Sequence, residues 1–479
     1  MKVTALVFSD LVFLFVFLPA VLFVYFIVRN ELKNVVLLIA SLLFYAWGEP
    51  KYVFLMLFSI TINYIFGLLI DKSRGNLSLK KLFLAIAIIG NVALLGVFKY
   101  ANFFVDNVNR LFGLSIELEP IPLPIGISFF TFQAMSYIID VYRRDAEVQR
   151  NLFNLSLYIS LFPQLVAGPI VRYNTIAEQI KRRFINLDKF SEGIRRFIIG
   201  LAKKVIIANS LGELADAIFS VPGEELSITA AWIGIIAYSM QIYFDFSGYS
   251  DMAIGLGKMF GFDFLENFNY PYIAKSVSEF WRRWHISLST WFRDYVYIPL
   301  GGSRKGLPRT VINLLIVWTI TGFWHGASWT FMAWGFYFGV LIVMERLWLL
   351  KWLEKLPRLL QHLYLLIIVM VGWVFFRADN FSYSLEYVRT MFGLTGTPVI
   401  DGVTRMYLND YWFMIFISVI CSIPVAKILK NRLQDFSFYR KALMPVASIM
   451  MPFVYLSLMV FSMILLVNQT FNPFIYFRF

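Results

Sequence analysis

The sequence consists of long apolar runs separated by short polar segments. Many runs are about 15 to 24 residues long, which is the length that an α-helix needs to cross a lipid bilayer. A membrane β-barrel would instead show short segments of alternating apolar and polar residues. The pattern therefore predicts an all-α, polytopic membrane protein with about 11 to 12 transmembrane helices. We expect these spans near residues 6–28, 33–47, 52–70, 82–99, 125–142, 193–209, 228–246, 311–324, 327–345, 360–376, 411–429 and 444–468.

No long linker, low-complexity tract or internal repeat interrupts the pattern. We therefore expect one integral-membrane domain over residues 1–479, with its core at 125–345. The first run follows only Lys2 and lacks a small-residue cleavage site, which favours a transmembrane helix over a cleaved signal peptide. Hydrophobic residues make up 59% of the chain and the mean hydropathy is +0.68, whereas soluble domains are about 45–50% apolar.

Basic residues are concentrated in particular loops, and the formal net charge is +13. Cytosolic loops of membrane proteins carry an excess of lysine and arginine, so we expect the loops at 72–81, 143–150, 172–204 and 282–309 to face the cytosol. The acidic loop at 209–227 and both termini should then lie outside. This placement indicates that the basic residues set the membrane topology and contact anionic lipid headgroups, and it argues against nucleic-acid binding. It is also compatible with binding of a phosphorylated donor.

The chain has a single cysteine, Cys421. This count excludes an intramolecular disulfide and a cysteine metal cluster. Because no H-E-x-x-H sequence is present either, we expect no metal site. A Walker A sequence and a G-x-S-x-G elbow are also absent, so the usual signals of soluble nucleotide-binding enzymes and serine hydrolases are missing.

The segment 152–171 is apolar but has basic residues on both sides. Its last part contains Pro163, Gly168 and Pro169, which favour a hairpin that enters the membrane and turns back. Such broken backbone is tolerated in a membrane only where protein or a water-filled cavity satisfies its polar groups. We therefore expect Gln164 to line an internal cavity. The alternative is a proline-kinked span, which would change the topology by one crossing.

Residues 279–304 combine tryptophans, arginines and a histidine within an otherwise apolar chain. Read as one helix, the aromatic side chains and the histidine share one face, and basic side chains lie on another. This pattern predicts an amphipathic helix at the membrane surface, with guanidinium groups towards water or phosphate. Pro299, Gly301 and Gly302 should end the helix in a turn. The residues of interest are Trp281, Trp284, His285, Arg282, Arg283, Arg293, Arg304 and Lys305.

The segment T-G-F-W-H-G-A-S-W at 321–329 places His325 between two apolar spans, with Trp324 and Trp329 beside it. Ionisable side chains at such depth are expensive and usually functional. A neutral imidazole can take a proton from a hydroxyl or a thiol. From the spacing alone, a catalytic histidine and a hydrogen-bonded structural histidine remain equally good interpretations. The third histidine, His362, begins a span and is expected to be interfacial.

Two carboxylates, Asp245 and Asp251, lie at the edge of an apolar run. They are costly there unless they are paired or hydrated. They could form a polar cavity wall, or they could make structural salt bridges to nearby arginines.

These blocks resemble the membrane-bound O-acyltransferase family. The resemblance is carried by F-W-R-R-W-H-I-S-L-S-T-W-F-R-D-Y-V-Y-I-P-L-G-G-S-R at 280–304 and by T-G-F-W-H-G-A-S-W at 321–329. The stretches 241–257, 163–169 and 472–479 are similar to the family's bacterial branch. That branch contains alginate and peptidoglycan O-acetyltransferase membrane subunits and, more distantly, the D-alanyl transfer protein of teichoic acids.

The resemblance implies a ring of tilted helices around a thin centre, with funnels that open to both faces. It also implies an acyltransferase in the bacterial cytoplasmic membrane. The invariant histidine of the family falls on His325, and a second polar position of the family falls on His285. We expect His325 to be the general base for an acceptor hydroxyl, and His285 or the tryptophan-rich wall to orient the thioester carbonyl.

The expected reaction moves an acyl group, most simply acetyl from acetyl-CoA, to an extracytoplasmic polysaccharide or peptidoglycan. No bound cofactor is expected. The basic residues at 282–305 would hold the donor phosphates. The family's bacterial branch implies a separate extracytoplasmic partner with a Ser-His-Asp (SGNH) hydrolase-like domain. Two alternatives stay open: D-alanyl transfer from a carrier protein to teichoic acid, and a non-enzymatic transporter or flippase.

Overall fold

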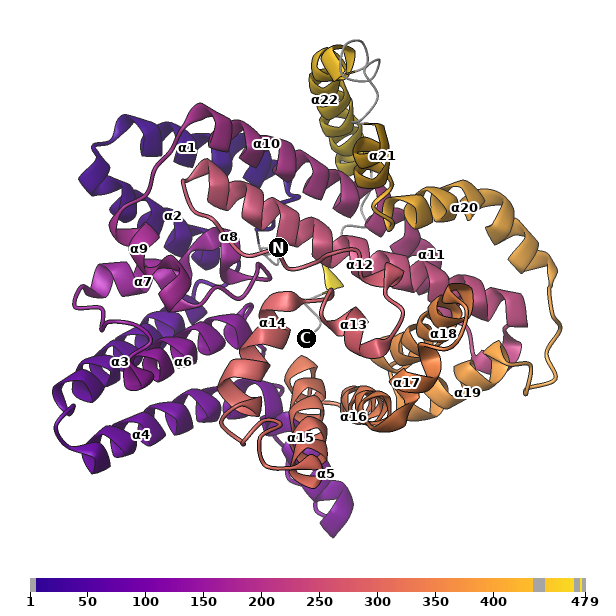
Figure 1. Cartoon of the computed structure of the whole chain (residues 1–479), viewed down its shortest axis with the longest axis horizontal. Coiled ribbons are helices and arrows are strands. Elements are labelled where there is room, and N and C mark those ends of the chain that lie inside the picture. Colours follow the sequence, from indigo (N-terminus) through magenta and orange to yellow (C-terminus); the bar gives the residue numbers. More distant parts are fainter. Residues whose placement is uncertain (1–5, 434–443, 469–473, 476–479) are drawn as a thin grey trace. The chain divides into compact units, whose positions relative to one another are not determined.

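The computed structural model describes residues 6–433, 444–468, 474 and 475, and these residues form helices and connecting loops without a strand (Figure 1). The predicted all-α class is therefore confirmed. Of the C-terminal stretch 472–479 that carried part of the family resemblance, only Phe474 and Ile475 are described.

The chain divides into two compact units, which we describe separately. The first comprises Met1–Phe197 and Met252–Leu265, and the second Ile198–Asp251 and Glu266–Phe479. The first unit contains the turns η1 (Phe13–Phe17), η2 (Asn30–Leu32) and η3 (Gly96–Tyr100) and the helices α1 (Leu18–Ile27), α2 (Lys33–Gly48), α3 (Tyr52–Lys72), α4 (Leu77–Leu95), α5 (Ala101–Phe112), α6 (Ile127–Arg143), α7 (Leu152–Ser160), α8 (Phe162–Leu165) and α9 (Tyr173–Lys181). Two helices, α10 (Leu187–Ala202) and α12 (Ile228–Met259), have residues in both units.

Helices α3, α4 and α6 of the first unit pack against one another (Figure 1). A second group of contacts joins α2 to α7 and α8. Here the rings of Phe13, Phe17, Phe44 and Phe162 lie with centroids 5.5 to 6.3 Å apart, which is the range of favourable aromatic pairs. The Ser41 hydroxyl accepts a hydrogen bond from the Phe162 N–H at 3.0 Å, so the start of α8 is held against α2.

The segment 152–171 turns back on itself, as the hairpin interpretation predicts. At its two ends, the Gln149 side-chain amide donates a hydrogen bond to the Tyr173 hydroxyl at 3.1 Å. Helix α7 has nine residues, or roughly 14 Å at 1.5 Å per residue, which is about half of a bilayer core. A single kinked span is therefore disfavoured. Gln164 is fully buried within this hairpin.

The second unit contains the remaining elements. They are η4 (Lys203–Ala208), α11 (Asn209–Phe219), η5 (Gly223–Glu225), η6 (Pro271–Ile273), α13 (Val277–Trp281), α14 (Ile286–Phe292), η7 (Arg293–Tyr297), α15 (Leu307–His325), α16 (Trp329–Met344), η8 (Glu345–Leu349), α17 (Leu350–Leu353), α18 (Arg358–Arg377), α19 (Phe381–Met391), α20 (Gly402–Cys421), α21 (Val425–Leu433) and α22 (Met444–Asn468).

Helices α15 and α16 form the closest helix pair of this unit. Gly322 and Gly335 face each other where the backbones approach, and a Cβ on Gly322 would collide with the carbonyl oxygen of Phe331. Helix α18 packs on the other side of α16. Between them lies an aromatic core in which Trp281 contacts Trp334 and Phe338, at centroid distances of 5.5 and 5.0 Å. The short helix α13 is thereby fixed to the helices that follow it.

Seven of the described helical segments are long and apolar enough to cross a membrane, or eight if the bent pair α20 and α21 counts as one span. The protein is therefore a multi-pass membrane protein, but this number is lower than the 11 to 12 spans expected. Helix α6 has only 17 residues and is almost entirely buried, so its apolar sequence reflects contact with protein as well as with lipid. The seven segments are Asn30–Gly48, Tyr52–Lys72, Leu77–Phe112, Leu307–His325, Trp329–Leu353, Arg358–Arg377 and Ser448–Asn468.

The orientation of these spans stays a prediction, and the single cysteine makes it testable. Glu225 and Arg182 are both exposed. Glu225 lies in a loop expected outside the cell, and Arg182 lies in a loop expected in the cytosol. In a Cys421→Ala background, we expect Glu225→Cys to react with an impermeant maleimide in intact cells. Arg182→Cys should react only after permeabilisation, because positive loops stay in the cytosol. The reverse pattern would invert the topology.

Candidate functional site

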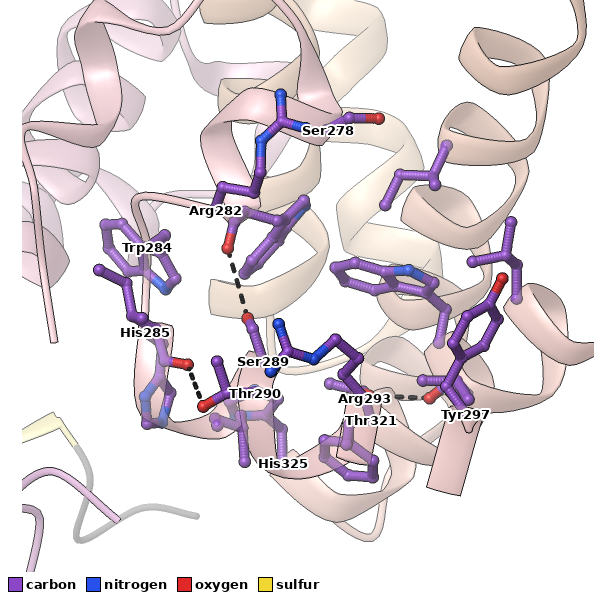
Figure 2. Close-up of a pocket in the computed structure, with 18 of the residues that line it drawn as sticks. Ser278, Arg282, Trp284, His285, Ser289, Thr290, Arg293, Tyr297, Thr321 and His325 are labelled. Carbon is purple, nitrogen blue, oxygen red and sulfur yellow. Dashed lines mark hydrogen bonds between the residues drawn. The ribbon is translucent and has the colours of Figure 1, made fainter. Parts of the chain in front are cut away.

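The second unit encloses a cavity of about 550 Å³ that contains both predicted histidines. In the view of Figure 2, Ser278 and Arg282 lie at one end, and His285 and His325 at the other. The volume is in the range of small-molecule sites. The lining residues are Ser278, Trp281, Arg282, Trp284, His285, Ile286, Leu288, Ser289, Thr290, Phe292, Arg293, Tyr297, Leu314, Val317, Trp318, Thr321, His325, Ile342 and Arg346.

The wall formed by residues 277–297 is not the continuous amphipathic helix that the sequence pattern predicted. Helix α13 ends after five residues, and α14 begins at Ile286. Between them His285 has φ +45° and ψ +54°, a left-handed conformation that costs a non-glycine residue free energy. The break turns Trp281 and Trp284 into buried positions and leaves Arg282 exposed. The predicted turn at Pro299–Gly302 is present, with φ values of +107° at Gly301 and +56° at Gly302.

A buried carboxylate fixes the start of this wall. Glu345, 2% exposed, accepts hydrogen bonds from the backbone N–H groups of Val277 at 2.7 Å and Ser278 at 2.8 Å. It also accepts one from the Tyr364 hydroxyl at 3.3 Å. Because the N–H groups at a helix start have no partner within the helix, Glu345 stabilises α13 from η8. This role is not visible in the sequence, because a Glu-Arg pair after an apolar run is typical of a solvated helix end.

His285 is 1% exposed and is held on two sides. Its Nδ1 lies 3.2 Å from Oδ1 of Asn267, and the edge of the Phe246 ring contacts its ring at a centroid distance of 4.6 Å. The segment lies outside the candidate membrane spans, and burial lowers the pKa of His285 to about 3. The imidazole is therefore neutral at physiological pH. One of its ring nitrogens then donates a hydrogen bond, and the other accepts one.

His325 is the last residue of α15 and is 4% exposed. Its ring is surrounded by aromatic rings: the centroids of Trp324, Trp334 and Phe376 lie 4.9, 5.0 and 5.2 Å away. Trp324 also contacts the His285 ring at 6.5 Å, so one indole links the two histidines. Of the predicted aromatic wall, Trp281 and Trp284 line the cavity, whereas Trp329 is 56% exposed and lines a separate shallow groove.

Three arginines line the cavity: Arg282, Arg293 and Arg346. Figure 2 shows the Arg293 side chain extending towards Ser289. Arg293 pairs with Asp294 at 2.7 Å. Within the part of the chain that the structure describes, Arg282 and Arg346 have no ion pair. The sequence interpretation missed Arg346, which a π-helical turn after α16 directs into the cavity; such turns are frequent at functional sites.

The other predicted basic residues lie elsewhere. Arg283 pairs with Glu279 at 2.8 Å, and neither it nor Arg304 or Lys305 lines the cavity. Arg304 and Lys305 are exposed in the turn before α15.

The two aspartates do not line this cavity either. Asp245 pairs with Lys204 at 2.7 Å and Asp251 with Lys203 at 2.6 Å. The salt-bridge interpretation was therefore the better one, with lysines in place of the expected arginines. The backbone N–H of Ile475 also donates to Asp245 at 2.9 Å. Gln164 belongs to the first unit.

A second, smaller cavity of about 210 Å³ reaches the neighbourhood of His325. Phe376 lines this cavity, and its ring also packs against the His325 ring. The polar lining includes Gln241 and the ion pair between Arg377 and Asp216, whose closest atoms are 2.6 Å apart. The third histidine, His362, lies in neither cavity; its Nδ1 lies 3.0 Å from the Ala274 carbonyl oxygen.

Known proteins resemble this chain over most of its length. The family model of membrane-bound O-acyltransferases matches residues 127–377. A probable alginate O-acetylase of Azotobacter vinelandii is 45% identical over 392 residues, which are 81% of this chain and 78% of the relative. A peptidoglycan O-acetyltransferase of Helicobacter pylori is 38% identical over 434 residues, 83% and 82% of the two chains. A teichoic acid D-alanyltransferase of Bacillus subtilis is 30% identical over 242 residues, 48% and 60%.

Proposed function

Because the chain belongs to the membrane-bound O-acyltransferase family, we propose that it transfers an acetyl group from cytosolic acetyl-CoA to a polysaccharide or peptidoglycan at the bacterial cell surface. The chain is an acyltransferase of a membrane; the acetyl group, its donor, the acceptor and the cytoplasmic membrane are the proposal. The observation that carries it is the placement of His285 and His325 in one cavity whose lining also includes three arginines.

The chemistry of acyl transfer needs a nucleophile that loses its proton beside a thioester carbonyl. We assign the base to His325, because its imidazole lies among apolar rings at the end of α15 and can take up a hydroxyl proton. The carbonyl carbon then bonds to the acceptor oxygen, the C–S bond breaks, and the proton on His325 passes to the leaving thiolate. His285 would orient a reacting group in the same cavity.

The acceptor side is assigned to the smaller cavity, since Phe376 is both part of its lining and a contact of the His325 ring. We also propose an extracytoplasmic partner with a Ser-His-Asp hydrolase-like domain, which would receive the acetyl group and pass it to the polymer. Membrane lipids are expected around the exposed apolar helices.

Donor binding is proposed at Arg282, Arg293 and Arg346. A charge-assisted hydrogen bond contributes roughly 1.5–3 kcal/mol, so replacing Arg282 or Arg346 by alanine should raise the donor KM about tenfold or more with little change in kcat. Arg304→Ala serves as the matched control, because this exposed arginine lies outside the cavity. Unchanged donor KM in both cavity variants would mean that these charges set the membrane topology and do not bind the donor.

The identity of the acyl group can be tested directly. Membranes that contain the full chain are given either labelled acetyl-CoA or a labelled D-alanyl carrier protein, and label in the cell-surface polymer is measured. We expect transfer from acetyl-CoA, since the O-acetyltransferase relatives match more of the chain at higher identity than the D-alanyltransferase relatives do. If label reaches the polymer from the D-alanyl carrier protein and not from acetyl-CoA, the protein is a D-alanyltransferase and the acetyl-transfer proposal is wrong.

A further inference from the structure

Asn267 is buried at 1% exposure and lies against the backbone around His285. Its carbonyl oxygen accepts the Ile286 N–H at 3.0 Å. Its side-chain Oδ1 accepts the Ser287 N–H at 3.1 Å and the Ser287 hydroxyl at 2.9 Å. The same Oδ1 lies 3.2 Å from Nδ1 of His285. Asn267 therefore contacts three consecutive residues at the start of α14, one through its backbone carbonyl and two through its side-chain oxygen.

These contacts determine which way round the Asn267 amide lies. Asparagine oxygen and nitrogen atoms are assigned from their hydrogen-bond partners. A backbone N–H can only donate, so the atom that faces the Ser287 N–H must be the oxygen. An oxygen of an amide can only accept, so the His285 nitrogen that faces it must carry the proton.

We propose that Asn267 is a positioning residue that holds His285 in the Nδ1–H tautomer, so that Nε2 presents a lone pair to the substrate. A neutral imidazole has one N–H, and the partner of one ring nitrogen therefore decides the state of the other. The low pKa that burial gives His285 supports the neutral form.

This tautomer changes the role of His285 in acyl transfer. The change of role, unlike the tautomer itself, rests on the proposed function. A nitrogen with a lone pair cannot donate a hydrogen bond to a thioester carbonyl or to an oxyanion. His285 instead holds an O–H or N–H group of a substrate, either the acceptor hydroxyl or an amide N–H in the arm of the thioester donor. Stabilisation of the carbonyl oxygen then falls to donors such as the arginines of the cavity.

The tautomer can be measured without activity. Nitrogen-15 NMR of the full chain in detergent, labelled at histidine and assigned with His285→Ala, distinguishes a protonated from an unprotonated Nδ1. We expect wild-type His285 to show a protonated Nδ1 and an unprotonated Nε2 over the neutral pH range. A protonated Nε2, or an equal mixture, would overturn the proposal even if acetyl transfer is confirmed. If the protein turns out not to transfer acetyl groups, the expected spectrum stays the same, because the tautomer depends only on Asn267.

Kinetics give the second readout. Asn267→Ala should lower transfer by about tenfold to a hundredfold, the effect that removing an orienting partner has for metal-bound imidazoles. Ser287→Ala is the matched control, since it removes one donor to the same Oδ1 but keeps the backbone N–H. For His285→Ala, a rise in donor KM would identify the donor arm as the group it binds, and a fall in kcat would identify the acceptor hydroxyl. Asn267→Ala and Ser287→Ala with equal activity would contradict the proposal.

Asn267→Asp adds a pH test. The other titratable or charged groups that line the cavity are His325, Arg282, Arg293, Tyr297 and Arg346. A carboxylate beside Nδ1 favours imidazolium and raises the pKa of His285. Only the neutral ring presents a lone pair, so the variant should lose activity as the pH is lowered. This loss should begin at a higher pH than any loss of activity in the wild type. Superimposable pH profiles at wild-type rate would argue against a positioning role.

Discussion

Replacing His325 by alanine should reduce acetyl transfer by about 10² to 10⁴, the usual contribution of a general base. The reason is local: the ring contacts of His325 include Trp324, Trp334 and Phe376, and none of these three side chains can take the acceptor's proton in its place. His325→Gln should be nearly as inactive, because an amide fills much of the same space without basicity. This second variant separates a catalytic role from a packing role.

Transfer should be measured per amount of membrane-inserted protein, with His362→Ala as the control. His362 lies in neither cavity and has the Ala274 carbonyl oxygen as its partner, so its loss should have little effect. Near-wild-type turnover in His325→Ala or His325→Gln would remove this residue from the mechanism. An equal loss in His285→Ala would show that the two histidines act as a pair.

The second large effect is expected at Glu345. Glu345→Ala leaves the N–H groups of buried Val277 and half-buried Ser278 without their acceptor, which costs about 1–3 kcal/mol for the buried group. The start of α13 should then shift, and a displacement of about 1 Å in a positioning element can lower the rate about 10²-fold. Glu345→Gln should show an intermediate loss, since an amide oxygen can accept only on one side.

Thermal unfolding in detergent and the rate of acetyl transfer should both be recorded for these variants. Glu354→Ala is a suitable control, because this carboxylate is exposed a few residues later in the chain. Wild-type stability and rate in Glu345→Ala would mean that the short helix α13 keeps its position by aromatic packing alone.

The sequence predicted the class of the protein, and the two histidines that its short motifs singled out line one cavity. It predicted one helix over the first motif, and this was wrong because the backbone is left-handed at His285. Asn267 holds this break through contacts with His285 and Ser287, and Glu345 holds the start of α13 separately. Arg346 and Glu345 were missed for the same reason: their roles come from contacts with distant elements. Fewer of the described helices are long and apolar enough to cross a membrane than the 11 to 12 spans expected, because burial in protein and burial in lipid select the same apolar residues.

Transfer across the membrane is the central claim, and sealed inside-out membrane vesicles test it most directly. The vesicles contain the full chain and enclose the cell-surface acceptor and the partner, and acetyl-CoA labelled in the acetyl group is added outside. We predict that free CoA appears outside while labelled acetyl esters accumulate inside, and that His325→Ala abolishes both. Intact acetyl-CoA inside the vesicles, or label inside without release of CoA, would contradict the account and would indicate transport.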